Sequence, residues 1–209
     1  MKDEPRGRGS WSKMKNEPGT PSRGSKLAVV FPGIGYHKDK PLLYYATKLV
    51  QAAGYDVIHI EYHDMPQKIR GNAEMMKKAA LLATEQAEAA LQDVAFSSYE
   101  EVLFIGKSIG TVVAAKYIAD HGLQAKQVWY TPVEATFSFP GKNVLAFIGD
   151  ADPWSDVGVV KEKAAALGIP LHSYPNCDHS LETGDVVTDT RILHEVMDLT
   201  ERFMSRGDG

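Results

Sequence analysis

The sequence predicts a three-layer α/β/α domain built on a mostly or wholly parallel sheet of six strands. Short apolar runs alternate along the chain with longer segments of helix-forming composition. The apolar runs are nearly continuous in hydrophobicity, which is typical of strands that are buried on both faces of a sheet. Alternating strands and helices favour parallel pairing with right-handed crossovers, so that helices cover both faces.

The expected elements follow one another in a regular order. The strands are rich in β-branched and aromatic residues, and Gly54, Gly122 and Gly168 stand where three of the helices should end. The predicted strands are residues 27–31, 55–60, 102–105, 127–130, 144–148 and 170–174. The predicted helices are residues 41–53, 73–94, 109–120, 154–167 and 189–204.

The first 26 residues differ in composition from the rest of the chain. They are rich in Gly, Pro and Ser and contain seven Lys or Arg against three Asp or Glu, so their charge is +4 and that of the remainder is -8. Such a segment buries too little apolar surface to offset the entropy lost on ordering. We therefore expect a disordered tail over residues 1–26 and one folded domain over residues 27–209, with a functional basic arm as the alternative.

Charge and cysteine content restrict the classes of partner. The formal net charge of -4 leaves no basic surface typical of nucleic-acid binding, and no run approaches the roughly 18 apolar residues of a membrane span. The single cysteine, Cys177, excludes an intrachain disulfide and fits a reducing compartment. We expect a soluble, cytoplasmic protein whose partner is a small molecule, with no nucleic acid and no membrane partner.

Ser108 has the sequence context of a nucleophile. It lies in Gly106-Lys107-Ser108-Ile109-Gly110, between a predicted strand and a predicted helix. A serine hydroxyl is presented for attack from a sharp turn between a strand and a helix, and flanking glycines remove side chains that would collide there. The N-terminus of the following helix also favours a developing negative charge.

A general base and an orienting carboxylate are available after later strands. Asp150 and Asp152 follow the fifth predicted strand, and His179 follows the last one. In an open parallel sheet these loops meet at one edge, where ligands bind. His59 and His172 lie inside predicted strands and are expected to pack there, whereas His37 and His63 could line the mouth of a site. The remaining histidines, His121 and His194, lie on predicted helices.

From residue 27 to about residue 204 the chain resembles the α/β-hydrolase superfamily. The motifs that carry the resemblance are GKSIG (106–110), GDADP (149–153) and CDHSLE (177–182), in the chain order Ser, Asp, His. It looks like the small lidless branch, such as dienelactone-hydrolase-like enzymes and short esterases. This chain would begin at the third strand of the family's eight, which implies the strand order 2-1-3-4-5-6, and residues 131–142 are too few for a cap domain.

The resemblance implies a serine hydrolase that cleaves a small ester-like substrate through an acyl-enzyme. Ser108 would be the nucleophile, His179 the base and Asp152 the orienting acid, since the family's usual G-x-x-D spacing favours Asp152 over Asp150. The backbone N–H of Ile109 and that of Ile34, with Gly35 as the competitor, would form the oxyanion hole. No cofactor is implied. Thr131, Phe137 and Phe139 are expected either to rim this site or to pack at the sheet edge.

The sequence lacks the two common nucleotide-binding motifs. A P-loop would need glycine at Glu101, and a dinucleotide fingerprint would need it at Lys38. The only dense group of candidate metal ligands in the sequence is His59, Glu61, His63 and Asp64, and the first three could lie on one face of a strand. Acyl transfer, thioester hydrolysis and a non-catalytic binding module of the same fold remain the alternatives.

We predict that the N-terminal tail is dispensable, because it contributes no predicted strand, helix or site residue. Removing residues 1–24 should leave the melting temperature and the rate of ester cleavage nearly unchanged. Thermal denaturation and an ester assay on the full-length and truncated proteins measure both quantities. A large loss of either would show that the tail docks on the domain.

Overall fold

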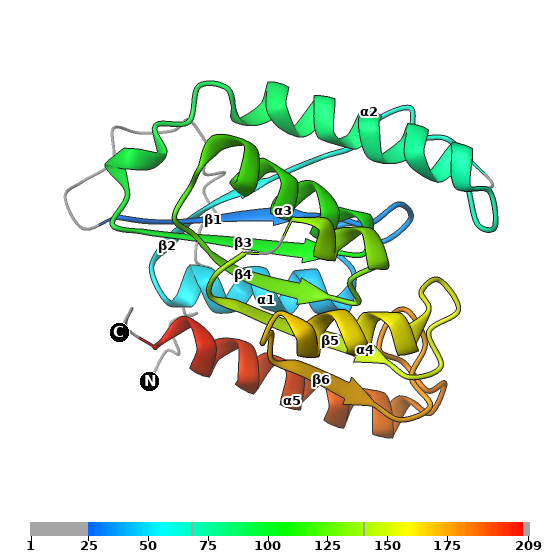
Figure 1. Ribbon diagram of the computed structural model, residues 1–209. Coiled ribbons are helices and arrows are strands. Elements are labelled where there is room, and N and C mark those ends of the chain that lie inside the picture. The colour runs from blue at the N-terminus through cyan, green and yellow to red at the C-terminus, as the bar shows by residue number, and fades with distance from the viewer. Residues whose placement is uncertain (1–24, 68, 140, 207–209) are drawn as a thin grey trace, which may run out of the picture.

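The computed structural model describes residues 25–67, 69–139 and 141–206. Its sheet has six strands, all parallel, in the order β2-β1-β3-β4-β5-β6 (Figure 1). This confirms the predicted fold class and strand order. The strands are β1 (Lys26–Phe31), β2 (Tyr55–His59), β3 (Glu101–Lys107), β4 (Lys126–Tyr130), β5 (Val144–Gly149) and β6 (Leu171–Tyr174).

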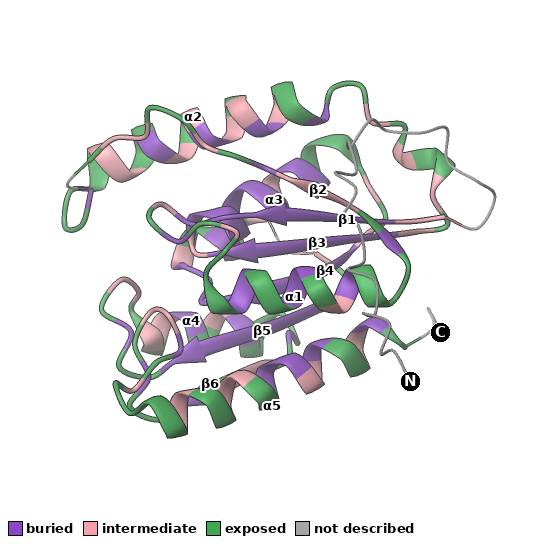
Figure 2. Ribbon diagram, turned by 180° about the vertical axis from the view of Figure 1, so that it is seen from behind, coloured by how far each residue is buried: buried purple, intermediate pink, exposed green. Residues whose placement is uncertain are grey.

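Helices cover both faces of the sheet. Helices α1 (Pro41–Ala52) and α5 (Val186–Met204) share an apolar cluster with one face, whereas α2 (Ala73–Leu91), α3 (Ile109–His121) and α4 (Val157–Ala166) pack on the other. Figure 2, which views the molecule from behind, shows α1 and α5 in front of the sheet. Two short 3₁₀ helices, η1 (Phe96–Ser98) and η2 (Glu134–Ser138), lie in connections.

The start of the domain differs slightly from the prediction. Residues 1–24 of the predicted tail lie outside the described residues, but Lys26 is the first residue of β1. Its Nζ lies 3.2 Å from a carboxylate oxygen of Glu101, and the carbonyl of Ser25 accepts a hydrogen bond from the N–H of Glu100. Strand β1 therefore begins at Lys26, one residue before the predicted start of the domain, and it pairs there with a strand on each side.

Capping residues shift two helix starts away from the predicted positions. The side chain of Asp156 accepts a hydrogen bond from the N–H of Val159, so α4 begins at Val157 and not at residue 154. Asp185 caps α5 in the same way through Thr188, so that helix begins three residues earlier than predicted. An aspartate that accepts from the free N–H groups of a first turn stabilises the helix start.

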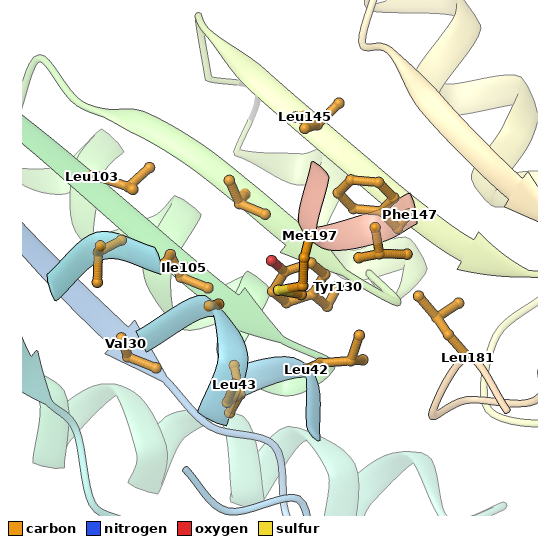
Figure 3. Close-up of a cluster of buried hydrophobic side chains, with 14 of the residues drawn as sticks. Val30, Leu42, Leu43, Leu103, Ile105, Tyr130, Leu145, Phe147, Leu181 and Met197 are labelled. Carbon is orange, nitrogen blue, oxygen red and sulfur yellow. The ribbon is translucent and has the colours of Figure 1, made fainter. Parts of the chain in front are cut away.

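The largest apolar cluster lies between the sheet and the α1–α5 layer. Figure 3 shows side chains from β1, β3, β4 and β5 meeting those of α1 and α5. Val30, Ile105, Tyr130 and Phe147 are completely buried there. At roughly 25 cal/mol per Å² of apolar surface, such burial is the main favourable contribution to folding. It also anchors the carboxyl ends of the strands and the loops that follow them.

The connection between β4 and β5 is short, as predicted, and holds only η2 among its described residues. The sheet edge at the carboxyl ends of the strands is therefore not covered from this connection. In the described ranges, no helix combines the length and apolar character needed to cross a membrane.

Candidate active site

The three loops singled out in the sequence converge at the carboxyl edge of the sheet. Ser108 follows β3, Asp152 follows β5 and His179 follows β6. All six strands point the same way (Figure 1), so the residues that follow them gather on one side of the domain. Residues that are 71 positions apart in the sequence, Ser108 and His179, are consequently neighbours.

Ser108 occupies a strained turn between β3 and α3. Its φ of 55° and ψ of -124° belong to a region that residues with a side chain rarely adopt, at a cost of about 1–3 kcal/mol. Three hydrogen bonds hold it there. Its N–H donates to the carbonyl of Tyr130 (3.0 Å), and its own carbonyl accepts from the N–H (2.9 Å) and the hydroxyl (2.6 Å) of Thr111.

Two glycines make this turn possible. A Cβ at Gly110 would lie 2.3 Å from the carbonyl oxygen of Phe31, and one at Gly106 would lie 2.7 Å from the Cα of Thr111. Both contacts involve backbone, which cannot move aside without shifting β1 or α3. Gly110 is thus required by the close approach of α3 to the end of β1, and Gly106 by the close approach of β3 to the first turn of α3.

The side chains of Ser108, His179 and Asp152 form a hydrogen-bonded series. His179 Nε2 lies 2.7 Å from Ser108 Oγ, and His179 Nδ1 lies 2.6 Å from Asp152 Oδ2. The second carboxylate oxygen of Asp152 accepts from the N–H of Trp154 at 2.8 Å. An ionised carboxylate only accepts, so Nδ1 carries the proton and Nε2 is free to accept from the serine hydroxyl.

Burial sets the protonation of this histidine. The side chain of Asp152 is fully buried and that of His179 is 15% exposed. Burial lowers the pKa of His179 below its ordinary value of 6.5, and this effect outweighs the hydrogen bond to Asp152, which raises it. The imidazole is therefore neutral at pH 7, as a group that accepts a proton must be.

Asp150, the competitor of Asp152, has a different position. Its Oδ1 accepts a hydrogen bond from the N–H of Asn176 at 2.6 Å, and the residue is exposed. This bond ties the loop after β5 to the loop after β6. The geometry thus brings Asp152, and not Asp150, to the imidazole.

A tight turn presents His179. The side chain of Asp178 accepts from the N–H groups of Ser180 (2.6 Å) and Glu182 (3.2 Å), and the N–H of Asp178 donates to the carbonyl of Glu182 (2.9 Å). Leu181 is buried within the α1–α5 cluster. The turn is therefore anchored to the core on one side while the imidazole faces Ser108 on the other.

The loop after β1 lies against Ser108. A Cβ at Gly33 would be 3.3 Å from the Cβ of Ser108. Gly33 and Tyr36 exchange two backbone hydrogen bonds (3.1 and 3.3 Å), which leaves Ile34 and Gly35 at the tip of a closed turn. Within the described residues, the N–H groups of Ile34 and Gly35 have no acceptor, so both amides are available to an oxyanion.

Sequence reasoning missed an apolar and aromatic wall beside these residues. Ile109, the first residue of α3, packs with Ile69 from the connection between β2 and α2, and Trp154 packs against the same cluster. The Trp154 ring lies 5.8 Å from that of His179, and the Arg70 guanidinium lies 5.7 Å from the centre of the indole. No local sequence signal marks this connection, since only tertiary packing brings it to the site.

A cavity of about 410 Å³ adjoins the loop after β1. Its lining combines that loop with the residues that follow β2, including His37 and His63, which were expected near the mouth. The apolar part of the lining includes Ile34, Ile60 and Met65.

The side chains of Thr131, Phe137 and Phe139 pack against the rest of the domain. Phe137 contacts Trp129 edge to face, with ring centres 5.5 Å apart, and Phe139 packs against the same α4-side cluster. Thr131 is completely buried after β4. Of the two roles expected for these residues, packing is the one that their surroundings show.

The candidate metal ligands do not share one strand face, because β2 ends at His59 and the other three residues follow it. Glu61 pairs with Lys38, and the half-buried His59 has its pKa lowered by burial. Over residues 25–206 apart from 68 and 140, no three His, Cys, Asp or Glu side chains are grouped so that they could hold a metal ion.

Comparisons with known proteins identify the fold. No family model matches the chain, and no curated protein matches it in sequence. Solved structures match over most of their length. A serine hydrolase homologue from Coxiella burnetii has a TM-score of 0.63 at 16% identity, covering 87% of this chain and 85% of that one. A lidless serine hydrolase from Xanthomonas campestris has a TM-score of 0.61 at 15% identity, covering 85% and 84%.

A Pyrococcus furiosus esterase gives a TM-score of 0.60 at 13% identity, covering 89% of this chain and 85% of that one. The chain has the α/β-hydrolase fold. Within this fold it has the lidless architecture that the sequence motifs implied, since the described residues between β4 and β5 contain no cap domain. At identities this low, the likeness extends to the fold and not to an activity or a substrate.

We predict that Gly110→Ala disrupts the turn at Ser108. The added Cβ would collide with the carbonyl of Phe31, so the free energy of unfolding should fall by about 3 kcal/mol or more. Gly158→Ala in α4 is the matched control. Its Cβ would meet only the side chain of Asp156, at 3.2 Å, and alanine favours helix, so stability should change by no more than about 1 kcal/mol. Urea denaturation measures both variants, and equal stabilities would contradict the steric argument.

Proposed function

We propose that this protein is a serine hydrolase that cleaves a small ester-like substrate through an acyl-enzyme on Ser108. The observation that carries the proposal is the hydrogen-bonded series of Ser108, His179 and Asp152, with Nε2 2.7 Å from Oγ and Nδ1 2.6 Å from Oδ2. Serine is a weak nucleophile unless a base accepts its proton, and a neutral imidazole oriented by a carboxylate is such a base.

In the proposed reaction, Ser108 Oγ attacks the ester carbonyl while its proton passes to His179 Nε2. The carbonyl oxygen becomes an oxyanion, which the N–H of Ile109 and that of Ile34 or Gly35 stabilise. The imidazolium then gives its proton to the leaving alcohol, and the acyl group remains on Ser108. Water attacks this acyl-enzyme, its proton passes to His179, and collapse of the second tetrahedral intermediate releases the acid and restores the serine hydroxyl.

Structural likeness supports a hydrolase, because the matched solved proteins include serine hydrolases and an esterase. A small-molecule acyl substrate and a cytoplasmic setting belong to the same proposal, the latter because the chain has a single cysteine. Thioester hydrolysis and acyl transfer would use the same acyl-enzyme with a different leaving group or acceptor.

Labelling by a fluorophosphonate tests the proposal directly. Such a reagent reacts with a serine that a base and an oxyanion hole activate, so the wild-type protein should be labelled on Ser108, as peptide mass spectrometry would show. Ser108→Ala should abolish labelling and His179→Ala should nearly do so. A folded wild-type protein without labelling would favour a non-catalytic binding module.

The two aspartates provide a matched pair. Asp152→Asn should reduce kcat for p-nitrophenyl acetate by about four orders of magnitude, because an asparagine no longer holds the imidazole in the required tautomer. Asp150→Asn should have a much smaller effect, since among the described residues its carboxylate bonds only to the backbone of Asn176. The opposite ranking would assign the acid role to Asp150.

The protein should prefer esters with short acyl chains. Without a cap domain, little apolar surface is available beyond the cavity beside Ile34, and each buried methylene contributes only ~0.8 kcal/mol. We predict the highest kcat/KM for acetyl to hexanoyl p-nitrophenyl esters. Met65 lines the cavity, so Met65→Trp should move the optimum toward acetyl, whereas the exposed Leu167→Trp should not. Rates that climb steadily to palmitoyl esters would refute the open-site description.

A further inference from the structure

Lys107 is a buried cation that the proposed reaction does not use. It is the last residue of β3, directly before Ser108, and its exposed fraction is 0%. Its Nζ has no hydrogen-bond partner among the described residues, and it lies 4.8 Å from the centre of the Tyr36 ring. Buried lysines usually have an anionic partner, because an ammonium loses its hydration when it enters the interior.

The position itself would suit an apolar residue. Leu103 and Ile105 precede Lys107 at alternate positions of β3 and belong to the α1–α5 cluster, as does Tyr36. A side chain of similar length without charge, such as methionine, would fill the same space without being desolvated. The presence of an ammonium there therefore calls for an explanation other than packing.

Charges from two loops of the site act on Lys107. They are the carboxylates of Asp152, from the loop after β5, and Asp178, from the loop after β6. The positive charge of Lys107 acts in turn on His179. Tyr36 comes from the loop after β1, its hydroxyl accepts a hydrogen bond from the N–H of Leu42, and the charges of Glu182 and Asp178 act on it.

The helices that pack on this face contribute apolar side chains and hydrogen-bonded polar groups to the cluster. The hydroxyl of Thr200 lies 2.9 Å from that of Tyr130, and Glu195 accepts a hydrogen bond from Tyr174. The charges of Asp152 and Asp178 act on both Lys107 and His179, and each of these two groups can take up a proton.

We propose that Lys107 is a positioning residue that acts through His179: its ammonium, buried directly before Ser108 and without a hydrogen-bond partner among the described residues, opposes protonation of the imidazole that bonds to Ser108. This inference rests on the proposed function in so far as His179 is the general base. By this inference, the lysine of the GKSIG segment extends the reaction to lower pH, while its buried charge lowers the stability of the fold.

The titration directions agree with this arrangement. Burial lowers the pKa of Lys107 to about 7, and the two carboxylates only partly oppose the effect. The pKa of His179 lies below 6.5, and the charge of Lys107 is one of the causes. A positive charge on either group opposes a positive charge on the other, so the titration of each group depends on the other. The acid limb of the rate profile is thereby displaced to lower pH.

The test measures His179 itself and needs no turnover. The pKa of its imidazole is followed by the Cε1 proton signal in NMR, assigned by comparison with His179→Gln, in the wild type and in Lys107→Met. The variant should show a higher His179 pKa and an unchanged or higher melting temperature, since an unpaired buried charge has been removed. Lys161→Met, at an exposed position of α4, should change neither quantity.

If Lys107 had only a structural role, its replacement would change the melting temperature but not the pKa of His179. Lys107→Gln serves as a second uncharged variant. An unchanged His179 pKa in either folded variant would overturn the inference, and so would failure of both variants to fold, because the ammonium would then be required for structure.

Labelling of Ser108 separates this inference from the proposed function. If the wild type is labelled, Lys107→Met should lose about two- to fivefold in labelling rate at pH 5.5 relative to its own plateau, because one pKa unit corresponds to a tenfold change on the limb. If the wild type is not labelled although the His179 pKa still shifts, the hydrolase proposal fails while the electrostatic link between the two residues stands.

Discussion

The geometry of the site depends on the close approach of helix α3 to the end of β1. Gly110 touches the backbone of Phe31, and there is no space between them for a methyl group. This contact fixes how sharply the chain turns at Ser108, and it holds the serine at a positive φ that costs energy. The same contact sets the loop after β1 beside the serine, where its free amides lie. This one contact therefore sets both the position of the nucleophile and the position of the candidate oxyanion donors.

A second constraint is electrostatic, because the site gathers three ionisable groups in a dry environment. Asp152 and Lys107 are fully buried side chains, and His179 is nearly so. Charges in such surroundings act on one another more strongly than in water, since little solvent screens them. The lowered pKa of His179 is the sum of burial, an attractive carboxylate and a repulsive lysine. Stability and chemistry are therefore coupled here, and a residue that weakens packing can still improve the base.

Much of the fold could be predicted because its signals are local. Continuous apolar runs marked all six strands, and the alternation with helices implied parallel pairing. Helix starts were less accurate where the capping residue was not recognised, as at Asp156 and Asp185. The two residues before residue 27 were assigned to the tail on composition, although Lys26 pairs in β1, because composition does not report on a neighbouring strand such as β3.

The sequence by itself determined the order of strands and helices, and it nominated Ser108, Asp152 and His179 through motifs at strand ends. Parallel topology is enough to bring such loops to one edge. Only the tertiary structure decided that Asp152, and not Asp150, reaches the imidazole, and that Lys107 is buried with no hydrogen-bond partner among the described residues. It also placed Arg70 over Trp154 next to His179. These outcomes depend on distances between segments far apart in the chain, and the packing of several loops and side chains sets those distances together, so no local pattern encodes them.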